Sequence, residues 1–127
     1  MNPKNIVDLG CATGLWLELL NDILPSDCEF IGIDSDKESL KLATERSKLW
    51  DRKVKFLHLD LEKEVDKIPP SDITLAFNIF PYIDDLDSFI KALWNRSPHG
   101  VLAVRQYDGA SIRLSMISAI RQKMELD

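Results

Sequence analysis

The chain has 127 residues and a mass of 14.5 kDa, which is enough for one domain with its own hydrophobic core. Hydrophobic residues make up 45% and charged residues 29%, an ordinary balance for a globular protein. The 16 basic and 21 acidic residues give a net charge of −5, which disfavours a protein that binds nucleic acid through its phosphates. We therefore expect a single domain, residues 1–127, that binds a small molecule.

Three sequence features bear on the compartment and on metals. Cys11 and Cys28 are too few for a disulfide scaffold, and they have no companion residues that would make a metal site. No apolar run approaches the ~20 residues that cross a bilayer. The first residues lead directly into an apolar strand rather than into a signal peptide. We expect a cytoplasmic protein with no bound metal and no membrane partner.

Short apolar runs alternate with amphipathic ones along the chain, which is typical of βαβ units. The expected strands are 5–9, 29–33, 54–58, 72–77 and 100–104. Helices are expected after residues 14, 36 and 85, and a last one from Ala110 on the spacing of the apolar residues Ile112, Leu114, Met116, Ile117, Ile120 and Met124. In the second helix we place Leu40, Leu42, Ala43 and Leu49 on or near the inner face, with Trp50 partly exposed.

Parallel strands joined by crossover helices form a right-handed, doubly wound α/β sheet with helices on both faces. The predicted strand order is 3-2-1-4-5. Because the order reverses at the first strand, we expect the ligand crevice at the carboxyl ends of the first and fourth strands.

Glycines or acidic residues follow three successive strands. The turn Gly10-Cys-Ala-Thr-Gly14 follows the first strand, where glycine permits a tight turn and close approach of a ligand. Asp34 ends the second strand, 20 residues after Gly14, a spacing that suits a carboxylate accepting from both hydroxyls of a ribose. Asp60, after the third strand, suits an exocyclic amine such as that of adenine. A bare turn, a helix cap and a solvated acidic loop remain the alternatives for these three places, with Asp36 favoured over Asp34 as the helix cap.

The chain resembles class I S-adenosylmethionine-dependent methyltransferases of the small-molecule type. Ile6-Val-Asp-Leu-Gly-Cys-Ala-Thr-Gly14 is similar to their first motif, and Phe30-Ile-Gly-Ile-Asp34 to their acidic second-strand motif. Val54-Lys-Phe-Leu-His-Leu-Asp60 is similar to the third-strand motif, and residues 72–105 to the regions of the fourth and fifth strands. The resemblance implies a Rossmann-like fold, S-adenosylmethionine as cofactor and S-adenosylhomocysteine as product.

The resemblance also implies roles for individual residues. Asp34 would hold the ribose, with Ser35 flanking the adenine, and Asn78 would lie near the sulfonium. Ala12 is a departure, because the family usually has glycine there. The full set of implied cofactor-binding residues is Asp8, Gly10, Cys11, Ala12, Gly14, Asp34, Ser35, Asp60, Leu61 and Asn78.

On the acceptor side the candidate catalytic residues are Asn78, Tyr82 and Tyr107, with Asp84, Asp85 and Asp108 beside them. The sulfonium is already activated, so no protein nucleophile is needed, and a base is needed only if the acceptor must lose a proton. Asn78-Ile-Phe-Pro-Tyr82 superficially resembles the Asn-Pro-Pro-Tyr signature of methyltransferases that act on nucleic-acid bases. It departs from that signature at Ile79-Phe80 and by one extra residue, and the net charge of −5 also disfavours nucleic acid. For Asp84 or Asp85 we favour a helix cap.

Two other interpretations are weighed. A dinucleotide-binding enzyme would have Gly-x-Gly-x-x-Gly, but Ala12 and Leu15 stand where its second and third glycines would be. A non-catalytic domain that binds S-adenosylmethionine or a nucleoside, or an interaction domain with the same fold, stays open. Members of the family usually have a helix before the first strand and two more strands after the fifth. We expect a fragment or a minimal version whose fifth strand is an exposed edge, covered by a helix or by a homodimer contact.

Overall fold

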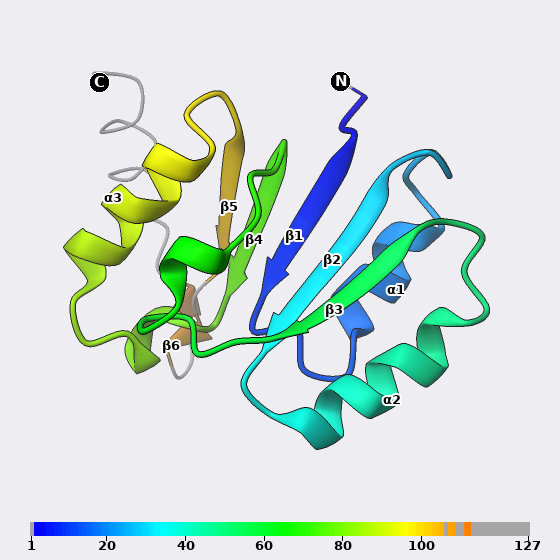
Figure 1. Cartoon of the computed structure of the whole chain (residues 1–127), viewed down its shortest axis with the longest axis horizontal. Coiled ribbons are helices and arrows are strands. Elements are labelled where there is room, and N and C mark those ends of the chain that lie inside the picture. The colour runs from blue at the N-terminus through cyan, green and yellow to red at the C-terminus, as the bar shows by residue number, and fades with distance from the viewer. Residues whose placement is uncertain (1, 106, 109–110, 113–127) are drawn as a thin grey trace.

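Five parallel strands form one sheet in the order β3-β2-β1-β4-β5 (Figure 1). The computed structural model describes residues 2–105, 107–108 and 111–112. The predicted doubly wound α/β fold and its strand order are confirmed. The strands are β1 (Asn5–Leu9), β2 (Glu29–Asp34), β3 (Val54–His58), β4 (Ile73–Phe77) and β5 (Val101–Arg105).

Helices connect the strands, as predicted. They are α1 (Leu15–Asn21), α2 (Lys37–Ser47) and α3 (Leu86–Arg96), with short 3₁₀ turns η1 (Val65–Lys67) and η2 (Phe80–Tyr82). The helix predicted from Ala110 is wrong at its start. The segment β7 (Ser111–Ile112) is extended and pairs antiparallel with β6 (Tyr107–Asp108), and pairing with a neighbouring strand overrides a helical spacing of apolar residues. The remaining positions of that predicted helix, 113–124, lie outside the described residues.

Side chains of each strand alternate between the two faces of the sheet, and each face has its own core. On one face Val7, Leu9 and Ile33 pack with Phe89 and Leu93 of α3. On the opposite face Ile6, Phe30 and Leu75 pack with Leu17 of α1 and with Trp50. Figure 1 shows α1 and α2 beside β2 and β3, and α3 beside β4 and β5. The prediction of helices on both faces is therefore confirmed.

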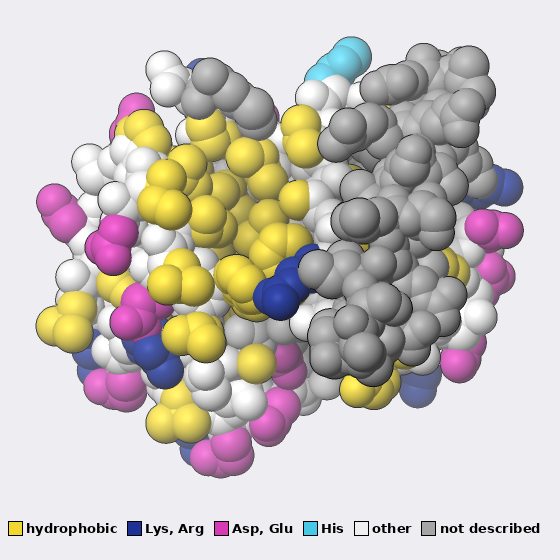
Figure 2. Space-filling model, turned by 180° about the vertical axis from the view of Figure 1, so that it is seen from behind, with side chains coloured by type: hydrophobic (Ala, Val, Ile, Leu, Met, Phe, Trp, Pro, Cys, Tyr) yellow, Lys and Arg dark blue, Asp and Glu magenta, His cyan; other side chains and the backbone are white. Residues whose placement is uncertain are grey.

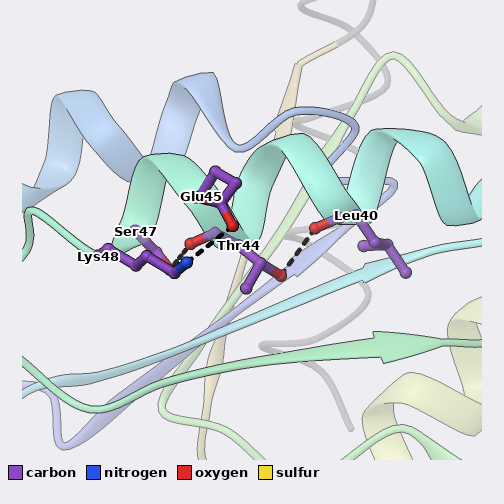
Figure 3. Close-up of polar contacts among 5 residues, drawn as sticks. All are labelled: Leu40, Thr44, Glu45, Ser47 and Lys48. Carbon is purple, nitrogen blue, oxygen red and sulfur yellow. Dashed lines mark hydrogen bonds and ion pairs between the residues drawn. The ribbon is translucent and has the colours of Figure 1, made fainter.

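The polar side chains of α2 hydrogen-bond largely to groups of the same helix. The side chain of Asp36 accepts from the backbone N–H of Glu38 at 3.2 Å, so the predicted cap is confirmed. Figure 3 shows the Thr44 hydroxyl donating to the carbonyl of Leu40 at 2.8 Å and the Ser47 hydroxyl donating to the carbonyl of Thr44. Lys48 pairs with Glu45 one turn earlier. The helix packs inward through Leu40 and Ala43.

Three predictions about this region were wrong. Leu42 and Leu49 are exposed, and Leu49 lies beyond the end of α2. Trp50 is buried, because the chain turns back after α2 and places its ring edge-on to Phe30, with the ring centroids 6.1 Å apart. Two residues past a helix the helical period no longer decides which side chains face the core.

Arg52, two residues before β3, fastens the end of α1. Its guanidinium lies 4.0 Å over the ring of Phe30. It donates to the side-chain oxygen of Asn21 at 2.7 Å and to four backbone carbonyls between 2.8 and 3.1 Å, those of Asn21, Leu24, Pro25 and Cys28. The last carbonyls of a helix have no partner within the helix, so this single side chain completes α1 and the turn that follows it.

The face seen from behind carries a broad central area of hydrophobic side chains (Figure 2). Leu15, Leu19 and Ile23, four residues apart along α1 and the turn after it, are more than half exposed. None of the helices in the described part of the chain has the length and apolar character needed to cross a membrane.

Candidate functional site

A cavity of about 480 Å³ opens at the carboxyl ends of the strands, where the sequence predicted the crevice. A volume of this size is ordinary for a small-molecule site. Among the residues predicted for the site, those lining the cavity are Gly10, Asp34, Ser35, Asp60, Leu61, Asn78 and Tyr82. The fold therefore brings residues from the ends of β1, β2, β3 and β4 to one place.

Asp34, the last residue of β2, is held by two backbone N–H groups. Its Oδ2 accepts from the N–H of Ala12 at 2.8 Å, and its Oδ1 accepts from the N–H of Asp36 at 2.8 Å. These bonds tie the glycine-rich turn to β2 and fix the plane of the carboxylate. Each carboxylate oxygen has a second lone pair, so Asp34 can still accept from two donors of a ligand.

The turn after β1 has three residues with positive φ: Gly10 at 71°, Ala12 at 49° and Gly14 at 82°. Close packing explains why both positions are glycine. A Cβ on Gly10 would lie 2.7 Å from Cγ2 of Ile79, and a Cβ on Gly14 would lie 3.3 Å from that of Ala43. The space left by these glycines is thus taken by the protein's own side chains, and Ala12 adopts a left-handed conformation that suits glycine better.

Asp8 and Cys11 lie buried behind the turn and do not line the cavity. Asp8 is 1% exposed, and its Oδ2 has no hydrogen-bond partner among the described residues. Burial first, and then the negative charge of Asp34, raises the pKa of Asp8 to about 7. Burial and the nearby Asp8 also raise the pKa of the Cys11 thiol, so Cys11 is a neutral packing residue rather than a nucleophile.

The loop after β3 is organised by Asp60. Its Oδ1 accepts from the N–H groups of Glu62 and Lys63 at 3.1 and 2.9 Å, and its own N–H donates to Glu64 at 3.1 Å. The same carboxylate lines the cavity. From the sequence, a solvated acidic loop and a place in the ligand site were alternatives for Asp60. In the structure Asp60 both shapes the loop and lines the cavity.

The loop after β4 carries Asn78 and Tyr82. Asn78 has a φ of 60°, and its N–H donates to the carbonyl of Arg105 at 2.6 Å, which joins this loop to the end of β5. Tyr82 is 81% exposed at the mouth of the cavity. Asp85 caps α3 by accepting from the N–H of Ser88, as predicted, and this bond lowers the pKa of Asp85.

Some predicted residues lie elsewhere. Ala12 and Gly14 belong to the turn but do not line the cavity, and neither do Asp84 and Asp85. Tyr107 and Asp108 form β6, and their side chains lie outside the described part of the structure. His58, the last residue of β3, does not line the cavity. Its Nε2 donates to the carbonyl of Ser35 at 2.9 Å.

The sequence reasoning missed four lining residues: Glu62, Phe77, Ile79 and Ile83. Phe77 could have been found, because it is the last residue of β4 and so lies at the same edge as Asp34. Glu62 could not have been singled out from the sequence, because it stands in an acidic stretch with Asp60, Glu64 and Asp66. The described residues contain no group of His, Cys, Asp or Glu side chains arranged to hold a metal ion.

Comparisons with known proteins agree on one family. The family model described as "Methyltransferase domain" matches residues 7–101. A trans-aconitate 2-methyltransferase of Rhizobium leguminosarum is 33% identical over 106 residues, which is 83% of this chain and 39% of that protein. A carboxy-S-adenosyl-L-methionine synthase of Helicobacter pylori is 32% identical over 106 residues, 80% of this chain and 42% of that protein. The chain thus spans about two fifths of these two curated relatives.

Solved structures share the fold. The plantazolicin methyltransferase BpumL, in complex with a pentazolic desmethylPZN analog and SAH, superposes with a TM-score of 0.70 at 22% identity, over 94% of this chain and 43% of that one. A SAM-dependent methyltransferase from Aquifex aeolicus has a TM-score of 0.70 at 17% identity, over 95% of this chain and 71% of that one. Coclaurine N-methyltransferase has a TM-score of 0.74 at 15% identity, over 84% and 32%.

Proposed function

Because this chain belongs to the family of methyltransferase domains, we propose that it uses S-adenosylmethionine to methylate a small-molecule acceptor. The observation that carries the proposal is the position of Asp34. Its carboxylate lines the cavity at the end of β2 and is oriented by two backbone N–H groups. A carboxylate held in this way is suited to accept from the two hydroxyls of a ribose.

The composition of the cavity fits this cofactor. Asp34, Asp60 and Glu62 supply acceptors for hydroxyl and amine donors, and their negative charge favours a ligand with a positively charged sulfur. Phe77, Ile79 and Ile83 add apolar surface beside them, which suits a purine ring and a thioether chain.

Within this proposal each side of the cavity has its task. Asp34 binds the ribose, with Ser35 beside the adenine, while Asp60 and Leu61 bind the adenine. Asp8 supports the turn after β1 from behind. The backbone of Gly10, Cys11 and Ala12 would border the methionine moiety, and Gly14 would complete the turn. Of these four residues Gly10 lines the cavity.

The bound cofactor supplies a methyl group on an activated sulfur. The chain's own residues need only hold an acceptor in line with it, and positioning alone can contribute ~7–11 kcal/mol in favourable cases. We assign this to Asn78 and Tyr82, on the loop that closes the cavity from the β4 side. Tyr107 remains a candidate from its position after β5.

Calorimetry with S-adenosylhomocysteine tests cofactor binding. We expect binding by the wild type and a loss of affinity of about 100-fold or more in Asp34→Ala, because each hydrogen bond to a carboxylate contributes ~1.5–3 kcal/mol. Asp27→Ala, an exposed residue after α1, is the control and should bind like the wild type. Circular dichroism checks that each variant folds. Absence of binding by the wild type, or equal binding by Asp34→Ala, would contradict the proposal.

Transfer of a labelled methyl group to small molecules from the native cell extract tests catalysis. Transfer that disappears with the cofactor analogue sinefungin supports an enzyme. Cofactor binding without transfer to any fraction would instead support a non-catalytic binding domain with the same fold. A nucleic-acid acceptor is disfavoured by the net charge of −5.

We further propose that residues 1–127 fold as one domain that pairs with a second copy through the edge of β5. Within the described sheet β5 has a neighbour only on the β4 side, and Val101 is 50% exposed. An open edge strand favours pairing. Light scattering should give the mass of a dimer, and a monomer at micromolar concentration would contradict this.

A cytoplasmic location fits the two cysteines, which are buried and form no disulfide, and fractionation of the native cell tests it.

A further inference from the structure

Two loops that border the cavity come from strands on opposite sides of the sheet centre. The loop of residues 59–64 follows β3, and the loop of residues 78–85 follows β4. In the sheet β2 and β1 lie between these two strands, so no strand pairing joins the loops. Leu59 and Leu61 of the first loop pack in the same hydrophobic cluster as Ile79 and Phe80 of the second. The hydrogen bonds between the described residues of the two loops come from the carboxylate of Glu62, a residue that also lines the cavity.

Glu62 uses both of its oxygens on the far loop. Its Oε1 accepts from the N–H of Asp84 at 2.8 Å, and its Oε2 accepts from the N–H of Asp85 at 3.3 Å. Asp85 is the N-cap of α3, so both donors lie at the positive end of an 11-residue helix. A carboxylate on such donors makes charge-assisted bonds, which are stronger than bonds between neutral groups.

Glu62 is equally fixed on its own side. Its N–H donates to Oδ1 of Asp60 at 3.1 Å, and Asp60 is in turn held through its own N–H by Glu64. Movement of Asp60 therefore moves the backbone of Glu62, and with it the carboxylate that holds residues 84 and 85. The chain of contacts runs from one wall of the cavity to the other.

We propose that Glu62 is a positioning residue that couples the two walls of the cavity. It holds the loop of Asn78 and Tyr82 in a fixed position relative to the loop of Asp60 and Leu61. One consequence rests on the proposed function: a cofactor bound against Asp60 also orders the loop that meets the acceptor. The coupling itself is a property of the protein without ligand.

Amide hydrogen exchange, measured by NMR on the full chain without ligand, tests the coupling. In Glu62→Gln only one side-chain oxygen remains, and an NH₂ group faces the N–H of Asp85. We expect the amides of Asp84 and Asp85 to exchange at least about tenfold faster than in the wild type. Asp66→Asn is the control, because it removes one negative charge from an exposed residue four positions after Glu62. It should leave the exchange of the Asp84 and Asp85 amides unchanged.

Glu62→Asp gives a second variant that keeps the charge but shortens the side chain by one CH₂ group. It should also release both amides. Unchanged exchange at Asp84 and Asp85 in Glu62→Gln and Glu62→Asp would overturn the proposal, whatever the protein binds.

Addition of S-adenosylhomocysteine tests the consequence. It should slow exchange at Asp84 and Asp85 in the wild type, although neither residue lines the cavity, and it should have no such effect in Glu62→Gln. Equal slowing in both proteins would show that the cofactor acts on this loop without Glu62. If the wild type binds no S-adenosylhomocysteine, the proposed function fails, and the coupling is still decided by the ligand-free exchange.

Discussion

The loops on the two sides of the sheet are held in different ways. On the β1–β3 side, side chains bond across elements to distant backbone, as Arg52 does to the end of α1 and Arg46 to the carbonyl of Thr13 at 3.0 Å. On the β4 side, Arg96 of α3 donates to the carbonyl of Ile68 at 2.7 Å, but the loop of residues 78–85 is bonded by Glu62, a residue from the opposite side. The turn that would meet the cofactor is thus held by Arg46 and Asp34, whereas Tyr82 on the acceptor side is 81% exposed.

The largest expected effect concerns the centre of the β1–β3 side. The pKa of Asp8 is about 7 in the folded chain, against 3.8 for the ordinary group. The folded state thus binds this proton more tightly, so the wild type should lose stability as pH rises from about 4 to about 7, on the order of 4 kcal/mol. Asp8→Asn removes this titration and should be the more stable protein at pH 8. Urea unfolding at several pH values measures the difference.

The control for Asp8→Asn is Asp66→Asn, which changes an exposed carboxylate. It should follow the wild-type pH profile. If the Asp8→Asn and wild-type profiles ran parallel from pH 4 to pH 8, Asp8 would not be the titrating group.

The next effect tests whether long-range side-chain bonds distinguish the β1–β3 side. Arg52→Ala should lower the free energy of unfolding by roughly 2–4 kcal/mol, since the carbonyl of Asn21 and those of the turn after α1 lose their donor and regain only water. Arg52→Lys should recover little, because one ammonium cannot replace a fork that bonds to several oxygens. Lys53→Ala, next to it and exposed, is the control and should change stability by less than about 0.5 kcal/mol. Equal unfolding curves for the two alanine variants would contradict a stabilising role of the Arg52 hydrogen bonds.

A smaller effect of opposite sign is expected in the turn after β1. Ala12→Gly should raise the free energy of unfolding by roughly 0.5 kcal/mol, because relief of the left-handed conformation outweighs the greater freedom of glycine in the unfolded chain. Ala92→Gly in the middle of α3 is the matched substitution and should destabilise by about 1 kcal/mol. Thermal unfolding distinguishes the two signs, and a destabilised Ala12→Gly would contradict the strain that we infer.

The smallest effect is expected at the other end of the sheet. Val101→Thr should change stability by less than about 0.5 kcal/mol, since Val101 on β5 is half exposed. Val7→Thr places the same hydroxyl at a fully buried site of β1 and should cost about 1–3 kcal/mol. Chemical unfolding at low protein concentration measures both. Equal losses at the two sites would contradict the exposure of Val101 in the separate chain. If β5 pairs with a second copy, the loss at Val101 should grow with protein concentration.

The sequence predicts most of the sheet because its evidence is local. The short apolar runs of Asn5–Leu9 and Glu29–Asp34 and the acidic caps Asp36 and Asp85 can each be recognised within a few residues. The rules of crossover connection then give the strand order. The same order places Asp34 and Asp60 at one edge. The resemblance adds their roles, which local patterns alone leave open.

What the sequence does not reveal are bonds between distant segments. Arg52 meets its oxygens 24 to 31 residues earlier, and Glu62 meets its two donors 22 and 23 residues later. No periodicity marks either residue, because the partners are backbone groups that every residue has. The prediction for Trp50 was wrong for a related reason, since its burial depends on a turn of the chain that brings it to Phe30.

The hydrogen bonds of Arg52 also bear on the order in which the chain folds during its synthesis. A ribosome delivers α1 and β2 before residue 52, so the carbonyls of Asn21 and of the turn after α1 meet this donor only once the segment between α2 and β3 has been made. Domains generally complete their folding as units during synthesis. We therefore expect the carbonyls at the end of α1 to be bonded to water while only residues 5–34 have been made, and the end of α1 to become ordered once the segment that leads into β3 has followed.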